Sequence, residues 1–338
     1  MTPTPLENII MPQLSYAYTL FLSNVIASLP FLLFGIMVSS GLLVFVNEHD
    51  FLAKLPRNRI LGAIVGSSLG MVLPVGQYGN IPVTRRLLLQ GVSIPLSISF
   101  LIASPVINPF VIWISWQVLG THPRLLFLRI FSAWLIGIIM GLIFSTYGDK
   151  TYESIPRNSG LEMRSTLLSS GNYLLPSQTS QPLHRAGNLI YEYTATTEIP
   201  LTWPKRCLLF GESLIQEFLE LGSILILGCA IVTAIQVFLP QGQLLDWAQT
   251  PVNQMLVMVL FSMVASVGSL WAPYVINPLM STFLYGSNLT FLLLSSLIDI
   301  KNIGLLFIIL RPKIAVYLLI FTAQLMGLLC LALNFYFS

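Results

Sequence analysis

Two oppositely charged side chains lie in the middle of an apolar run near the C-terminus. The run 288–310 contains Asp299 and Lys301, followed by Asn302. A charged group inside a membrane-spanning helix costs from about 2.5 kcal/mol upward and usually marks a pathway or an ionic partner. Two interpretations of Asp299 stay open: it carries a proton or holds a cation, or it makes a static bond to the backbone ends of an opposing broken helix. Residues two apart on a helix point to different sides, so pairing with Lys301 is not expected, and Lys301 can instead extend to an interface.

A second candidate site is the stretch 74–82, which holds prolines and glycines at a density that breaks any continuous helix. Inside a bilayer each unsatisfied backbone group costs several kcal/mol, so a broken helix persists only where protein or a cavity satisfies those groups. Transporters use such breaks to aim helix ends at a solute. The alternative is a kinked structural helix whose polar residues face a loop. The candidate residues are Pro74, Gln77, Tyr78, Gly79, Asn80 and Pro82.

A third interruption lies in the apolar run 92–119, which contains Ser104, Pro105 and Asn108 near its middle. The prolines free backbone carbonyls, and the asparagine supplies both a donor and an acceptor. We expect these three residues to line the same solute path as the other two stretches.

The composition requires that these stretches lie in a membrane. Of the 338 residues, 55% are hydrophobic and 9% charged, against about 25% charged in soluble domains, and the mean hydropathy is +0.81. The net charge of +3, without a basic helix or an aromatic–basic stripe, indicates no nucleic-acid partner. The three cysteines show no metal or disulfide spacing. No metal and no cofactor are expected.

The apolar runs that approach the length of a bilayer span fall into two groups of four. They are 18–46, 60–75, 92–119, 125–146, 208–239, 254–272, 288–310 and 314–336. The first run is too long for a cleaved signal peptide and no basic residue precedes it. We therefore predict an all-α polytopic membrane protein.

The polar stretch 147–206 separates the two groups. It has too little apolar area to order itself and is predicted to be a flexible cytoplasmic linker. The first membrane half is then 1–146 and the second 207–338. The halves agree in the order and spacing of their segments, with scattered identities such as Asn108 aligned on Asn302.

The second segment of each half determines how the halves are related. If 60–91 and 254–286 each dip into the membrane and return to the same face, each half has three full spans and the repeat is inverted. That arrangement gathers most Lys and Arg residues, including Arg85 and Arg86, on the linker side, as the positive-inside rule requires. It leaves Arg124 and Arg129 outside.

Other polar clusters have simpler interpretations. Glu48, His49 and Asp50 end a span, where such residues are usually solvated, and Glu217 and Glu220 fit an exposed cytoplasmic start of the fifth span. Catalytic motifs such as HExxH, GxSxG and the Walker loop are missing from the sequence. An enzyme is therefore not expected.

The run from Pro74 to Pro82, with the later Ser104-Pro105 and Asn108-Pro109, resembles the predicted permeases that include the organoarsenical efflux proteins, and the stretch 299–302 is similar to the second-half signature of one bacterial branch. The resemblance covers both membrane halves. Arsenical exporters of that family show Pro-x-Cys-x-Cys-Gly, where this chain has Gly76 and Tyr78 in place of the thiols, so the arsenical substrate does not carry over. The resemblance implies a permease of the plasma (inner) membrane, in some members with a small membrane-associated partner subunit.

We therefore expect a permease that moves a small solute, such as a metal, a metalloid or another small species, with coupling to protons through Asp299. Two other functions stay open. A non-transporting membrane anchor or sensor would show no uptake in liposomes, and an intramembrane enzyme would need further convergent catalytic groups in its spans.

Overall fold

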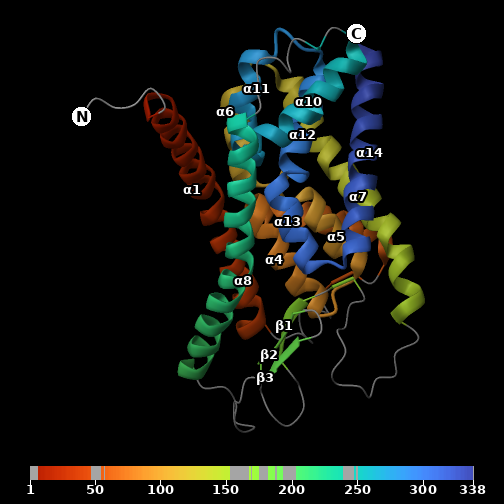
Figure 1. The fold of residues 1–338 in the computed structure, drawn as a ribbon. Coiled ribbons are helices and arrows are strands. Elements are labelled where there is room, and N and C mark those ends of the chain that lie inside the picture. Colours follow the sequence, from red (N-terminus) through yellow and green to blue (C-terminus); the bar gives the residue numbers. More distant parts are fainter. Residues whose placement is uncertain are drawn as a thin grey trace.

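The chain forms a bundle of long and short helices with one small sheet at one end (Figure 1). The computed structural model describes residues 7–46, 55–56, 58–152, 167–168, 170–174, 182–186, 189–192, 203–238, 247–248 and 250–337. The membrane part is helical, as the sequence predicts. Glu48, His49 and Asp50 lie outside the described residues.

In the first half, two long helices stand at either end of four shorter ones. The long helices are α1 (Glu7–Phe45) and α7 (Pro123–Tyr152). The shorter ones are α3 (Arg59–Ser68), which continues into the 3-10 turn η1 (Leu69–Met71), then α4 (Gly76–Leu89), α5 (Ile94–Ala103) and α6 (Pro109–Leu119).

The second half repeats this order of long and short elements. Its long helices are α8 (Trp203–Phe238) and α14 (Pro312–Phe337). Between them lie α10 (Pro251–Ala265), α11 (Gly268–Ile276) with the 3-10 turn η2 (Asn277–Leu279), α12 (Tyr285–Leu297) and α13 (Ile300–Ile309).

Four helices are long and apolar enough to cross a membrane: α1, α7, α8 and α14. The pair α12 and α13, bent by 42° at a short break, would make a fifth span if it is counted as one. These helices match the first, fourth, fifth, seventh and eighth apolar runs of the sequence. The fold is that of a polytopic α-helical membrane protein.

The region between the halves contains a small antiparallel sheet, which its composition does not predict. The strands β1 (Ser170–Leu174), β2 (Pro182–Ala186) and β3 (Leu189–Glu192) pair in that order. Just before β1, Leu168 forms a bridge with Leu310, and Arg311 N donates to Leu167 O at 2.9 Å. The chain between the halves is thus attached to the loop after α13. Much of 147–206 lies outside the described residues.

The pair α3 and α4 forms a hairpin whose two ends lie at the same end of the bundle. Next to the start of α3, Gly62 lies close to Ser93. After α4, Gln90 Nε2 donates to Leu42 O near the end of α1 at 2.9 Å. The α10–α11 hairpin is closed in a similar way, because Leu284 N, just past η2, donates to Gln254 Oε1 on α10 at 3.1 Å. Figure 1 shows α4 at the sheet end of the bundle and α10 and α11 at the other end.

The helix breaks follow from local backbone chemistry. Gly76 and Gly268 start the second helix of each hairpin with φ of 77° and 80°, a conformation that glycine adopts without the steric cost of a Cβ. Ser266, with φ of 46°, is strained for a residue with a side chain. Asn108 and Asp299 each cap the helix after a break, accepting from the backbone N–H two residues on. Asp299, rather than Asn302, therefore occupies the position equivalent to Asn108.

The α1 and α4 helices meet at two glycines. A Cβ on Gly35 would overlap the Gly79 backbone, and one on Gly79 would lie 3.0 Å from Gly35 Cα. We expect Gly35→Ala to lower the free energy of unfolding by about 1–3 kcal/mol, the usual cost of overpacking a core. Thermal unfolding of the purified protein in detergent measures the change.

Gly41 gives a matched control on the same helix, because a Cβ there meets nothing within 4 Å. Gly41→Ala should cost no stability, since alanine favours helix more than glycine does. Equal unfolding midpoints for the two variants would show that the close approach of α1 and α4 does not matter.

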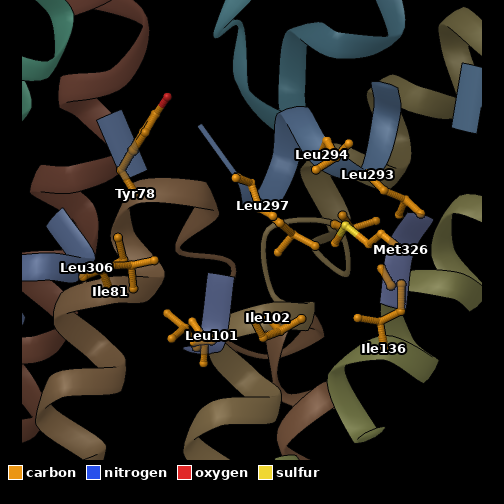
Figure 2. Packing of buried hydrophobic residues seen from close by; sticks show 14 of the residues in the cluster. Tyr78, Ile81, Leu101, Ile102, Ile136, Leu293, Leu294, Leu297, Leu306 and Met326 are labelled. Atoms are coloured by element: carbon orange, nitrogen blue, oxygen red, sulfur yellow. The ribbon is translucent and has the colours of Figure 1, made fainter. Parts of the chain in front are cut away.

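The apolar core is shared by both halves. Figure 2 shows residues of α4, α5 and α7 (Ile81, Leu101, Ile136) facing residues of α12 and α14 (Leu293, Met326). Tyr78 belongs to the same buried cluster, with its hydroxyl pointing away from Ile81 (Figure 2). The polar residues of the helix breaks therefore pack against a close-packed hydrophobic core to which both halves contribute.

Candidate functional site

Asp299 is the centre of a buried polar cluster between the two halves. It is fully buried at the N-terminus of α13. One carboxylate oxygen accepts from the Ser266 hydroxyl, and the other accepts from the Tyr78 hydroxyl at 2.7 Å. The Lys301 backbone N–H lies 3.3 Å from Oδ1. Both carboxylate oxygens thus have donors, which a buried charge requires.

Lys301 faces the same cluster. Its Nζ donates to Ser266 O at 2.8 Å, to Asn24 Oδ1 at 3.3 Å and to Ser28 Oγ at 3.3 Å. It also lies 4.0 Å from Asp299 Oδ2 and 5.5 Å from the centre of the Tyr78 ring.

The sequence-based expectation that Asp299 and Lys301 point apart was wrong. Asp299 has extended backbone (φ −118°, ψ 145°) and lies just outside the helix, so the helical spacing rule does not apply to it. Lys301 is 2% exposed and does not extend to an interface.

Gln77 joins the two hairpins. Its Oε1 accepts from Ser269 N at 2.7 Å, at the start of α11, and its Nε2 donates to Ser295 O at 3.1 Å, near the end of α12. One side chain of the first half therefore satisfies a free N–H and a carbonyl at two helix ends of the second half. Gln77, Tyr78, Asp299 and Lys301 come together, as the sequence predicts.

The three asparagines of the candidate set brace helix ends. Asn80 Nδ2 donates to Leu101 O at 2.7 Å, and Asn302 Nδ2 donates to Leu297 O at 3.1 Å. The side-chain oxygens of both are buried without a partner. Asn108 caps α6 by accepting from Phe110 N at 2.9 Å, and its contacts do not link it to Asp299.

The remaining candidates shape the breaks. Pro74 lies in the turn before α4, Pro82 lies inside α4, and Ser104 and Pro105 lie in the turn between α5 and α6. Gly79 provides the contact with α1 described above.

Several residues of the cluster escaped sequence reasoning. Ser266, Asn24 and Ser28 bind the Asp299–Lys301 pair. Asn24 Nδ2 in turn donates to Gln236 Oε1 at 3.2 Å, and Gln236 Nε2 donates to the last carbonyls of α10. For Ser266, the sequence offered one signal, the glycine at Gly268 that permits a helix break there. Single polar residues within long apolar helices carry no comparable signal.

Two arginines expected on the cytoplasmic side are buried in ion pairs. Arg86 Nη2 lies 2.9 Å from Glu217 Oε1, with both side chains buried, and Arg85 Nη1 lies 2.8 Å from Glu220 Oε2. Ser39 also donates to Glu217 at 3.3 Å. The expectation that the two glutamates mark an exposed helix start was wrong, because the Arg85 and Arg86 side chains of α4 bind them.

Arg129, expected outside the membrane, is also fully buried. Its Nη1 donates to Ser115 Oγ at 2.6 Å, and its Nη2 donates to Ser269 O at 2.7 Å and to Ser296 Oγ at 3.2 Å. The guanidinium thus ties α7 to α6, α11 and α12. Its position inside an apolar helix was the signal in the sequence.

Within the described residues, no three His, Cys, Asp or Glu side chains gather where they could share a metal ion. The chemistry that this arrangement offers is ionic and hydrogen-bonding. Polar side chains from α1 (Asn24 and Ser28), from α4 (Tyr78) and from the α10–α11 break (Ser266) converge on the two buried charges at the start of α13.

A polytopic bundle whose broken helices meet at buried charged residues is the architecture of a membrane permease. The comparison with known families agrees. Residues 13–335 match the family ArsP_1, described as a predicted permease, and the chain belongs to that family.

Two curated proteins are similar over most of their length. The chain is 29% identical over 285 residues to the UPF0718 protein YcgR of Bacillus subtilis, which covers 84% of this chain and 85% of that protein. It is 24% identical over 284 residues, 84% of this chain and 83% of the other, to a Streptococcus mutans protein named as a subunit of a two-component membrane permease complex. No solved structure matches the chain.

Proposed function

We propose that this chain is an alternating-access permease whose solute passes between the halves at the cluster around Asp299, with proton binding to Asp299 coupled to that movement. The observation that carries the proposal is the 2.7 Å hydrogen bond from Tyr78 of the first half to Asp299 of the second. A group that titrates at the contact between two bodies can bias how those bodies sit against each other.

The charges around Asp299 give the coupling a physical basis. The titratable groups that face it are Tyr78 from α4, Lys301 from α13 and the Cys229 thiol from α8. When Asp299 takes up a proton, Lys301 loses its negative neighbour. A buried ammonium without a counterion is costly, so the protonated state favours a conformation in which Lys301 Nζ meets water or a solute anion.

The two hairpins support an inverted repeat. The α3–α4 hairpin enters from the end of the bundle that carries the sheet, and the α10–α11 hairpin enters from the opposite end. In permeases, such paired half-helices form a solute site that opens alternately to the two sides.

We infer that the sheet end of the bundle, with region 147–206, is cytoplasmic and that the membrane is the plasma membrane. Basic residues at that end outnumber those at the other, where Arg124 lies in the first turn of α7, and the positive-inside rule assigns the richer side to the cytoplasm. The described basic residues at the sheet end include Arg59, Arg185, Lys205, Arg206, Arg311 and Lys313.

A second subunit is part of the proposal. The relative from Streptococcus mutans is named as one subunit of a two-component permease complex, and we infer that this chain likewise works with a membrane-associated partner. The proposed solute is a small species, which includes metals, metalloids and other small ions or molecules.

Cysteine labelling tests the path without knowledge of the solute. Ser28 is 1% exposed and contacts Lys301. In a background with the exposed Cys207 and the cluster-facing Cys229 both replaced by Ser, we expect Ser28→Cys to react with a membrane-impermeant thiol reagent in both right-side-out and inside-out vesicles. Because minor conformations typically hold about 0.1–10% of the population, its rate should be about that fraction of the rate at Cys207 in the wild-type chain.

Ser287→Cys is the matched control, since Ser287 is fully buried against Asn334 and contacts no residue of the Asp299 cluster. It should stay unlabelled from both sides. Protection of Ser28→Cys on both sides would contradict the proposal and favour a non-transporting anchor or sensor.

A further inference from the structure

Arg129 differs from the other buried cations in what it binds. Arg85, Arg86 and Lys301 each lie within 4.0 Å of a carboxylate. The guanidinium of Arg129 contacts two serine hydroxyls and one backbone carbonyl, and among the described residues it meets no carboxylate. Its Nε is buried without a hydrogen-bond partner.

This arrangement leaves a positive charge uncompensated in the interior. Burying a charge without a counterion costs far more than burying an ion pair. Charged residues inside membrane proteins usually face a pathway or a partner. The described part of the chain therefore supplies no negative charge to Arg129, and a bound anion would provide it.

We propose that Arg129 binds a small oxygen-bearing anion, an inorganic oxyanion or a carboxylate, and that the transported solute belongs to this class. The inference rests on the proposed permease function and specifies its solute. A guanidinium offers several N–H donors in a flat fork that matches two oxygens of such an anion.

The surroundings of Arg129 can yield to a ligand at little cost. The Ser115 hydroxyl also donates to Val111 O at 2.6 Å, and the Ser296 hydroxyl to Leu292 O at 2.8 Å. Both hydroxyls therefore keep a partner when an anion takes their place on the guanidinium. The free Nε adds a donor that is already desolvated.

The anion site adjoins the Asp299 cluster. Arg129 donates to the carbonyl of Ser269, whose N–H donates to Gln77, and Gln77 precedes Tyr78 in α4. With Arg129 and Lys301 positive and Asp299 negative, the joined network carries an excess positive charge. An anion bound at Arg129 neutralises this excess, and protonation of Asp299 increases the attraction, so a proton and an anion would bind cooperatively.

Anion binding can be measured on the whole protein in detergent. Unfolding is followed by tryptophan fluorescence in sodium sulfate, phosphate or acetate, with sodium chloride at the same ionic strength as reference. Sulfate and phosphate stabilise proteins non-specifically through exclusion from their surface, so the informative quantity is the difference between variants. We expect wild type to show saturable stabilisation by at least one salt. Comparing the stabilisation by acetate with the stabilisation by sulfate and phosphate shows whether the site prefers a carboxylate or an inorganic oxyanion.

Arg129→Gln should lower the apparent affinity for that anion by at least about tenfold, since it removes charged hydrogen bonds. Arg124→Gln removes an exposed arginine of the same helix and should bind as wild type does. If Arg129→Gln does not fold, Arg129→Lys can replace it, because lysine keeps the positive charge but lacks the flat array of N–H donors. We again expect a lower affinity for the anion.

No saturable effect in wild type, or equal binding by the Arg129 and Arg124 variants, would overturn the inference. Binding in detergent does not require transport. If none of the three anions stabilises the protein but Ser28→Cys is labelled from both sides, the anion site is contradicted and the proposed permease function is not.

Discussion

Replacing Asp299 with Asn is expected to abolish the proposed proton coupling while the chain still folds. The amide keeps the size of the carboxylate and an oxygen that can cap α13. It carries no charge, so Lys301 Nζ loses the carboxylate 4.0 Å away. Leaving one partner of a buried pair alone costs about 3–5 kcal/mol. The variant should therefore unfold at lower temperature and take up no proton at this position.

The measurement uses proteoliposomes with a pH-sensitive dye inside, exposed to a panel of metal, metalloid and oxyanion salts. For the salt that moves protons with wild type, we expect the Asp299→Asn rate to fall at least about tenfold, equivalent to about 1.4 kcal/mol or more in the barrier.

The double variant Asp299→Asn with Lys301→Met separates stability from function. It removes both charges, so stability should recover while proton movement stays lost. Proton movement at the wild-type rate in either variant would show that Asp299 is a static brace of the α10–α11 break.

Removing the charge of Glu217 should be at least as damaging to stability. Glu217 is fully buried, and its Oε1 lies 2.9 Å from Arg86 Nη2. Glu217→Gln removes the carboxylate that faces Arg86 Nη2, and breaking a buried ion pair costs about 3–5 kcal/mol. A reduced midpoint of thermal unfolding and a lower yield of folded protein are the expected results.

Glu212 provides the control, because it is an exposed glutamate on the same helix. Glu212→Gln should change stability by about 0.5 kcal/mol or less. Pairing Glu217→Leu with Arg86→Met removes both charges and should restore most of the loss. Equal stability of Glu217→Gln and Glu212→Gln would mean that water reaches the pair and screens it.

The helix breaks could be predicted because their causes are local. Glycine at Gly76 and Gly268 permits positive φ, and Asn108 and Asp299 are side chains suited to capping. Apolar length likewise marks the spanning helices, since a bilayer requires it. The structure confirms the membrane class and the helix interruptions that these local features predict.

The partners of the charged residues could not be predicted, because they come from tertiary packing. Nothing near Arg86 in the sequence points to Glu217 on α8, or near Arg129 to Ser269 and Ser296. The positive-inside count placed Arg86 on the cytoplasmic side and Arg129 outside the membrane. Their true positions depend on where a returning hairpin and a neighbouring helix lie.

The contact between Gly35 and Gly79 links the polar centre to the lipid. Since the two backbones touch, α4 cannot shift at Tyr78 without carrying α1 along. The outward face of α1 is broadly apolar, with Ile26 and Phe34 exposed, so any tilt of that helix changes how its hydrophobic length fits the acyl chains. If the chain works by the proposed alternating access, membrane thickness and fluidity therefore contribute to the free energy of each conformational change.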